Sequence, residues 1–315
     1  MESDNNSNHP YISVVIPVYG CRACLYELYS RLVNTLESIN HNFEIIMVND
    51  ACPQNSWEIL KELAEKDQRV RAINLSRNFG QLKAVLAGLD CATGDWIVVM
   101  DCDLQDSPEE ITRLYNKAQE GYDAVFGRRN ERKDTLIKRF NSFWFYKFYN
   151  YFTDGAFDHS LCNYSICSRI VIDNYLKLRE QSRAFTLFIK WMGFNQAHID
   201  IDHVNRADGK SSYTLKKRWN LAQDIITTQS NKPLRFSIGL GMFVSMAAFI
   251  YTLGLVIQYL LHTHTPVSGW TSLIVSLYFL SGLILMNIGI VGIYIGKIFD
   301  ETKARPIYII KDMIN

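Results

Sequence analysis

The sequence predicts an α/β protein in which helices cover both faces of a mostly parallel sheet, followed by a two-helix transmembrane hairpin. Three observations support this. Apolar runs rich in Val and Ile alternate with amphipathic segments over residues 11–127, two long uncharged blocks lie near the C-terminus, and basic residues flank those blocks. Strands covered on both faces are nearly all apolar, whereas amphipathic helices repeat apolar residues every three to four positions.

Strands and helices are expected to alternate along the first part of the chain. The strands are predicted at 11–18, 43–50, 71–76, 95–101 and 122–127. The helices are predicted at 24–39, 56–67, 78–90 and 107–121. Ser107 and Pro108 supply an N-cap and a first-turn proline for the last of these helices.

The two C-terminal blocks, 236–261 and 270–295, each contain 26 residues without a charge. A helix of that length rises about 39 Å, more than the roughly 30 Å of a hydrocarbon core. We therefore expect a cytoplasmic domain at 1–235, and a transmembrane hairpin with a cytoplasmic tail at 236–315. The alternative is a pair of buried helices in a soluble domain.

Basic residues indicate the orientation of the hairpin. The connector HTHTPVSGW between the blocks has no Lys or Arg, so the positive-inside rule places it outside and both termini in the cytoplasm. The N-terminal MESDNNSNHP has no apolar stretch, and no signal peptide is expected. The flanking basic residues are Lys216, Lys217, Arg218, Lys232 and Arg235 before the first block, and Lys297, Lys303 and Arg305 after the second.

Net charge and cysteine usage narrow the functional class. A net charge of +1 gives no global electrostatic footprint for nucleic acid. The seven cysteines all lie in the predicted cytoplasmic part, are odd in number and lack framework spacing, so reduced thiols are expected. Cys21 and Cys24 form a CxxC, but no second pair or His cluster completes a zinc site, which favours a packing role over the alternative of a redox or metal function.

Polar residues gather where the predicted strands end. Asp101 and Asp103 end the fourth strand, and two such close carboxylates repel one another unless something positive binds them. A D-x-D at a strand end suits a hard divalent cation that also binds a diphosphate. The alternative is a pair of surface or helix-capping acids. The other polar residues at strand ends are Tyr19 and Gly20, Asn49 and Asp50, and Arg77.

Ordered motifs over about residues 11–310 resemble those of the polyprenyl-phosphate glycosyltransferases in glycosyltransferase family two. The group includes dolichol-phosphate mannose synthases and, more similar here, bactoprenol glucosyltransferases with a C-terminal hairpin. The resemblance implies a GT-A-like fold. The motifs are IPVYG, VNDACP, LSRNFGQLKAVLAGL, MDCDLQDSPEE, RADGKSSY, NKPLRFS and YIGKIFDETKARPIYII.

The resemblance also implies roles for individual residues. Asp101, Asp103 and Gln105 correspond to the Mg²⁺ or Mn²⁺ ligands of a D-x-D-x-Q motif, and the two acids are the catalytic candidates. The remaining implied contacts are Pro17, Tyr19 and Asp50 with the nucleoside, Arg77, Arg206 and Lys210 with the donor, and Arg129 and Arg132 with the acceptor phosphate. For each basic residue the alternative is a solvated charge or a lipid-headgroup contact.

Three positions depart from the family pattern. PVYNE becomes PVYGC, so that Cys21 replaces a Glu near the nucleoside, and the DDGS-like segment becomes residues 49–52, NDAC. A pattern resembling GDFRL becomes CNYSI, so that Asn163 replaces a candidate catalytic base. A lipid phosphate has a second pKa near about 6 and is largely a dianion at neutral pH, so it needs no base. Asn163 therefore indicates a specificity difference.

Two segments outside the predicted strands indicate membrane contact. FNSFWFYKFYNYF (140–152) is aromatic and follows a basic run, which favours an interfacial helix over the alternative of a buried one. LKKRWNLAQDIITT (215–228) is a basic amphipathic approach to the first span. Within the hairpin, Asn287 is expected to hydrogen-bond across the helices, and Gly289, Gly292 and Gly296 to allow close contact.

The sequence therefore predicts inverting transfer of a sugar from a nucleotide-diphosphate sugar, with UDP favoured, to polyprenyl (undecaprenyl) phosphate. The reaction is expected at the cytoplasmic face of a bacterial inner membrane, for cell-surface glycans such as lipopolysaccharide O-antigen. Related enzymes suggest a homo-oligomer. The alternatives are a processive polysaccharide synthase and a non-catalytic scaffold or flippase subunit.

Overall fold

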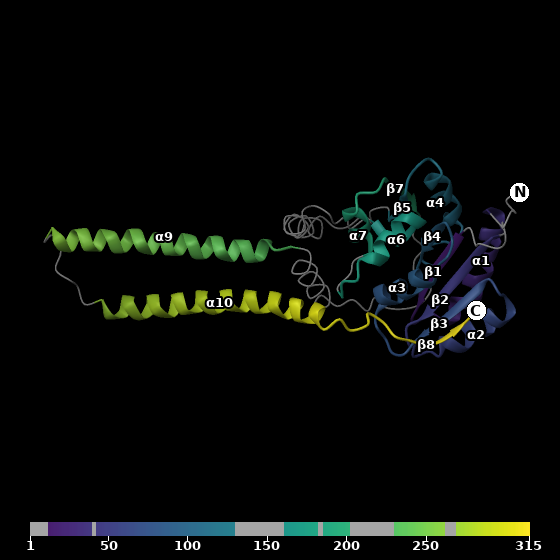
Figure 1. Ribbon diagram of the computed structural model, residues 1–315, viewed down its shortest axis with the longest axis horizontal. Helices are drawn as coiled ribbons and strands as arrows, with labels where there is room; N and C mark the ends of the chain where they lie inside the picture. The colour runs from purple at the N-terminus through teal and green to yellow at the C-terminus, as the bar shows by residue number, and fades with distance from the viewer. Residues whose placement is uncertain (1–11, 40–41, 130–160, 182–184, 202–229, 262–268) are drawn as a thin grey trace, which may run out of the picture. The chain divides into compact units, whose positions relative to one another are not determined.

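The computed structural model describes residues 12–39, 42–129, 161–181, 185–201, 230–261 and 269–315. The chain forms an eight-stranded sheet with the order β7-β5-β6-β4-β1-β2-β3-β8 (Figure 1). The strands are β1 Ile12–Val18, β2 Phe43–Asn49, β3 Val70–Leu75, β4 Trp96–Val99, β5 Ala124–Arg129, β6 Leu161–Ser168, β7 Gln196–Ile201 and β8 Ile310–Ile314.

The helices follow the strands in the predicted alternation. They are η1 Arg22–Cys24, α1 Leu25–Ile39, α2 Ser56–Lys66, α3 Gln81–Cys91, α4 Glu110–Ala118, α6 Arg169–Lys177, α7 Phe185–Trp191, α9 Lys232–Leu260 and α10 Trp270–Thr302. The predicted α/β class and its helix–strand alternation are confirmed, and every predicted element as far as β5 is present.

Each face of the sheet carries its own apolar cluster, as expected for strands covered on both sides. Ile12, Val14 and Ile16 of β1 pack with residues of α1, α2 and α4. Val15, between them, lies in a second cluster with residues of α3, α6 and α7. This alternation along one fully buried strand explains why the strand sequences are almost uninterrupted apolar runs.

The sheet is mixed, because β6 pairs antiparallel with both β4 and β5, and β8 pairs antiparallel with β3. β8 lies in the predicted tail, beyond the second uncharged block, and no strand was predicted there. Its side chains are mostly exposed, so it shows no apolar run. Asp312 of β8 accepts a 3.2 Å hydrogen bond from Asn74, and Asn315 donates to the carbonyls of Ala64 and Val70.

α9 and α10 match the two predicted uncharged blocks and are long and apolar enough to cross a membrane. Large apolar side chains remain exposed on them, for example Phe243 at 72% and Tyr278 at 74%, as expected for helices that contact lipid. Asn287 takes part in the predicted hydrogen bond across the pair, in which its Oδ1 accepts from the Ser237 hydroxyl. The predicted close contact at the glycines is wrong within the described part of the chain, because a Cβ at Gly289, Gly292 or Gly296 meets nothing there within 4 Å.

A buried turn before β4 fixes this strand against β1. A Cβ placed on Gly94 would lie 2.7 Å from the backbone nitrogen of Ser13, and the Gly94 amide donates a 2.7 Å hydrogen bond to Ser13 Oγ. The Ser13 hydroxyl in turn donates to Glu44 over 2.6 Å. Only a residue without a side chain allows the turn to approach the central strand this closely.

Gly94→Ala should therefore lower the free energy of unfolding by about 2 kcal/mol, because the new methyl group collides with backbone atoms that cannot move aside. Chemical denaturation of the purified protein measures this. Asp95→Ala, at the adjacent exposed position, is the matched control and should stay within about 0.5 kcal/mol of the wild type. Equal stability of the two variants would contradict the close contact at Gly94.

Candidate active site

Most of the predicted strand-end residues follow four adjacent strands, β4, β1, β2 and β3. These strands are parallel: β1 pairs with β2 and β4, and β2 pairs with β3. Their carboxyl ends therefore meet at one edge. The chain runs outward from β1 through β2 to β3 and then returns to β4 on the other side of β1. Ligands of open α/β sheets bind outside the strand ends at such a reversal.

The loop after β4 carries the D-x-D-x-Q residues at this reversal. Asp101 accepts a 2.6 Å hydrogen bond from Nε2 of Gln81, the first residue of α3. Asp103 accepts a 3.2 Å bond from the backbone amide of Gln105, across Leu104 with its left-handed φ of 58°. The three predicted ligands are thus held in a short turn and remain partly exposed.

The donor chemistry of this turn fits a hard divalent cation. Two carboxylates and an amide oxygen are the ligands that Mg²⁺ and Mn²⁺ prefer, and Mg²⁺ is commonly held by one or two carboxylates together with substrate phosphates. Within the described ranges no three His, Cys, Asp or Glu side chains are grouped to hold a metal ion. Two acids and a bound diphosphate would therefore have to share the cation.

Asp50, at the end of β2, organises the loop that follows β3. Its carboxylate is only 2% exposed and accepts hydrogen bonds from the amides of Phe79, at 2.7 Å, and Gly80, at 2.9 Å. Burial raises the pKa of Asp50, while the two amides and nearby Arg77 act in the opposite direction. The Arg77 guanidinium lies 4.3 Å from the centre of the Phe79 ring. Asp50 thus positions the loop that presents Arg77.

The remaining nucleoside candidates lie at the end of β1. Tyr19 is 54% exposed, and Gly20 beside it has a φ of 76°. Pro17 is buried within β1, opposite Val48 of β2 in the register. Asp50, Tyr19, Arg77 and the D-x-D turn therefore belong to neighbouring loops, whereas Pro17 supports them from inside the strand.

Several predicted residues fall outside this description. Arg132, Arg206 and Lys210 lie outside the described residues, as do the segments 140–152 and 215–228 and residues 262–268 of the connector. Arg129 ends β5, where it pairs with Ile201 of β7. The predicted acceptor-phosphate contacts therefore stay predictions.

Two features of the site were not predicted. One is the contact of Gln81 with Asp101. The only feature of the sequence that could have indicated it is the position of Gln81 near the start of a predicted helix. Cys21 and Cys102 form a disulfide, so the prediction that all seven cysteines are thiols is wrong for these two. The two cysteines are 81 residues apart in the sequence. Their pairing can be recognised only from the strand order, which places the loops after β1 and β4 next to each other.

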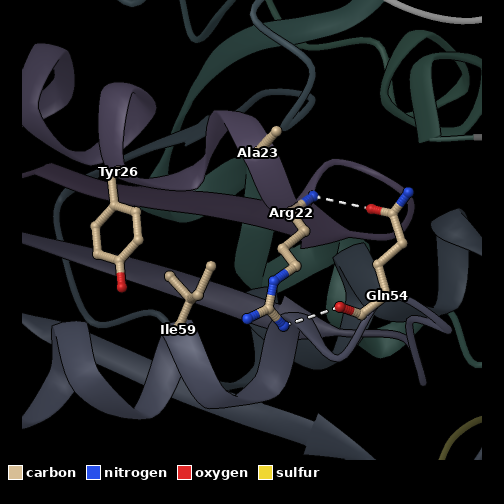
Figure 2. Close-up of a pocket in the computed structure, with 5 residues that line it drawn as sticks. All are labelled: Arg22, Ala23, Tyr26, Gln54 and Ile59. Carbon is tan, nitrogen blue, oxygen red and sulfur yellow. Dashed lines mark hydrogen bonds between the residues drawn. The ribbon is translucent and has the colours of Figure 1, made fainter.

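A pocket of about 530 Å³ lies next to the β1 loop and is lined by Arg22, Ala23, Tyr26, Gln54 and Ile59 (Figure 2). Its lining contains none of the predicted site residues. The Arg22 guanidinium donates a 2.9 Å hydrogen bond to the Gln54 carbonyl and also donates to the Asn55 carbonyl. The positive charge of Arg22 therefore holds the loop after β2 in place. The pocket does not extend the candidate site.

Comparisons with known proteins identify the family of the chain. Residues 13–178 match the profile of Glycosyl transferase family 2. The chain is 37% identical over 306 residues to uncharacterized glycosyltransferase YkcC of Bacillus subtilis (strain 168), covering 97% of this chain and 94% of the relative. It is 35% identical over 301 residues to the bactoprenol glucosyl transferase of Shigella phage SfX, covering 95% and 98%.

A solved structure, S. aureus TarS 1-349 in complex with UDP-GlcNAc, matches with a TM-score of 0.47 and 14% identity over 70% of this chain and 66% of that one. This likeness is too distant to inform on ligands. The profile match and the two nearly full-length relatives, by contrast, identify the family. The chain belongs to glycosyltransferase family 2.

Proposed function

We propose that this glycosyltransferase moves a sugar from a nucleoside diphosphate sugar to polyprenyl phosphate at the cytoplasmic face of a bacterial membrane. The observation that carries the proposal is the likeness to bactoprenol glucosyl transferase over 95% of this chain, a span long enough to include helical hairpin and tail as well as the sheet. UDP is the favoured nucleotide, and the lipid product would serve cell-surface glycan modification or assembly.

The reaction is a single displacement. A phosphate oxygen of the lipid attacks the anomeric carbon of the sugar, and the bond from that carbon to the diphosphate oxygen breaks. The configuration at the carbon inverts, and a nucleoside diphosphate leaves. A divalent cation held by Asp101, Asp103 and Gln105 would neutralise charge on the departing diphosphate. Tyr19, Asp50 and Arg77 are assigned to the donor, with Arg206 and Lys210 as further phosphate contacts and Arg129 and Arg132 as contacts of the acceptor phosphate.

The rival functions explain less of the chain. A processive polysaccharide synthase carries a Q-x-x-R-W motif and more spans, whereas Arg-Trp occurs here only at Arg218 and Trp219, in LKKRW, and two helices cannot build a polymer channel. A scaffold or flippase subunit has no need for a D-x-D-x-Q turn where the strand order reverses.

The C-terminal strand supports the hairpin topology. Only residues 303–309 separate α10 from β8, which is part of the sheet. Seven residues reach at most about 25 Å, less than the roughly 30 Å of a hydrocarbon core. If α10 crosses a membrane, its C-terminal end must therefore lie on the same side as the catalytic domain. The preceding helix α9 then has to cross in the opposite direction.

The first prediction concerns the two acids. Asp101→Asn or Asp103→Asn should lower sugar transfer at least about a hundredfold, because loss of a ligand charge removes several kcal/mol of leaving-group stabilisation. Transfer is measured by mass spectrometry of undecaprenyl phosphate after incubation with Mg²⁺ and a panel of nucleotide sugars. Asp95→Asn is the matched control and should retain activity. EDTA should abolish wild-type transfer, and full activity in EDTA would remove the metal from the mechanism.

Another prediction concerns the membrane topology of the hairpin. Ser268→Cys, in the connector, should react with a membrane-impermeant maleimide added to intact cells, whereas Lys303→Cys, in the tail, should react only after lysis. The native cysteines all lie in the domain proposed to be cytoplasmic, so wild-type cells provide the background. Labelling of Lys303→Cys alone from outside would place the site on the wrong side for cytoplasmic nucleotide sugars.

The third concerns the absence of a carboxylate at Asn163, a β6 residue whose carbonyl accepts a 3.0 Å bond from Ser165. If the acceptor attacks as a dianion, kcat/KM should rise with pH through about 6 as the lipid phosphate ionises. Asn163→Asp should then change kcat/KM less than about tenfold at neutral pH. A much larger gain, with a new pKa in the profile, would show that the reaction profits from a base.

A further inference from the structure

The disulfide between Cys21 and Cys102 crosses the candidate site. Cys21 lies three residues after β1, and Cys102 lies three residues after β4. Their Cα atoms are 6.2 Å apart, and both residues are 6% exposed. β1 and β4 are parallel neighbours, and the amide of Met100 donates a further 3.2 Å hydrogen bond to the carbonyl of Val15. The bond therefore joins the loops on the two sides of the strand-order reversal.

Each of the two cysteines is adjacent to residues of the proposed reaction. Cys102 stands between Asp101 and Asp103, so its backbone position sets that of both carboxylates. Cys21 follows Tyr19 and Gly20, in the loop proposed to meet the nucleoside. The other five cysteines form no disulfide within the described part of the chain. The single covalent cross-link seen there thus lies where donor and metal would bind.

We propose that Cys21 and Cys102 are a reversible thiol-oxidation site that controls donor binding, an inference that rests on the proposed function. Cytoplasmic thiols are kept reduced, and disulfides in that compartment are usually transient, catalytic or redox-sensing. The thiol form is accordingly the working state. With a peroxide as oxidant, the two thiols give up two hydrogens, the S–S bond forms, and the peroxide is reduced to water. A dithiol reverses the reaction and becomes a disulfide itself.

The bonded form is the state of low activity. A donor diphosphate has to enter between the loops after β1 and β4, and the covalent bond prevents these loops from separating. Hydrogen bonds also restrain the D-x-D turn. The Gln81 side chain donates one to Asp101, and the Gln105 backbone amide donates one to Asp103. Reduction removes the covalent restraint and leaves the hydrogen bonds, which a metal and a diphosphate can displace.

The experiment compares the two redox states of the full-length protein in detergent. One sample is treated with hydrogen peroxide and the other with dithiothreitol, and alkylation followed by peptide mass spectrometry reports the Cys21–Cys102 linkage. Mn²⁺ binding in the presence of UDP is followed by electron paramagnetic resonance, and sugar transfer is assayed in parallel. We expect the linked form to bind Mn²⁺ and UDP at least about tenfold more weakly, to lose transfer to a similar extent, and to recover with dithiothreitol.

Two variants make the test specific. Cys21→Ser should be insensitive to peroxide in both assays, whereas Cys24→Ser, three residues on in η1 and outside the bond, should respond as the wild type does. Equal Mn²⁺ affinity of the linked and reduced forms would overturn the proposal, as would equal peroxide sensitivity of Cys21→Ser and wild type. If no donor supports transfer, the linkage and Mn²⁺ measurements still decide this question, so the failure of the proposed function is distinguishable.

Discussion

The parallel pairing of β1 with both β2 and β4 is the constraint on which the site depends. Because all three strands run in one direction, the chain must leave each of them at the same edge of the sheet, and three loops from distant parts of the sequence converge. The strands themselves are buried on both faces. Polar residues inside the strands are used within the fold, as when the Ser13 hydroxyl donates to Glu44. The polar residues proposed to meet a ligand instead follow the strand ends, which is why Asp50, Asp101 and Tyr19 lie in neighbouring loops without any local sequence signal that joins them.

Around this edge, several polar groups that could have bound a ligand are used to hold the loops in place. The buried Asp50 carboxylate accepts two backbone amides and so fixes the path that presents Arg77. Asn49 donates a 2.8 Å hydrogen bond to Asn74 and accepts one from the amide of Cys52. The altered NDAC segment is consequently held by hydrogen bonds of Asn49 and Asp50, while Ala51 between Asp50 and Cys52 adopts a left-handed φ of 50°.

Sequence periodicity was sufficient for the local elements but not for contacts between distant ones. Apolar runs predicted β1 to β5, because a strand that is buried on both faces has an almost entirely apolar sequence. Amphipathic segments predicted the helices between them. β8 escaped prediction because its side chains are mostly exposed, and its stability comes from pairing with β3 and from the Asn74–Asp312 hydrogen bond.

The site shows the same division between local and distant information. The D-x-D turn was visible as a motif, since both acids directly follow an apolar run. The Cys21–Cys102 bond was not visible, because pairing two cysteines 81 residues apart requires knowledge of the strand order. Gln81 likewise becomes informative only when α3 is known to begin beside the end of β4. Predicting a contact between two distant residues requires knowledge of the strand order. Recognising a motif requires only the sequence around one strand.

The C-terminal strand links the two halves of the chain in a way that composition alone does not suggest. β8 is held at the sheet edge, and Tyr308 just before it donates a 2.6 Å hydrogen bond to Asp90 at the end of α3, the same carboxylate that Arg179 contacts at 2.6 Å. Asp90, Arg179 and Tyr308, far apart in the sequence, thus share one contact on this domain, so that the C-terminal segment is built into the sheet domain through side chains as well as through the pairing of β8 with β3.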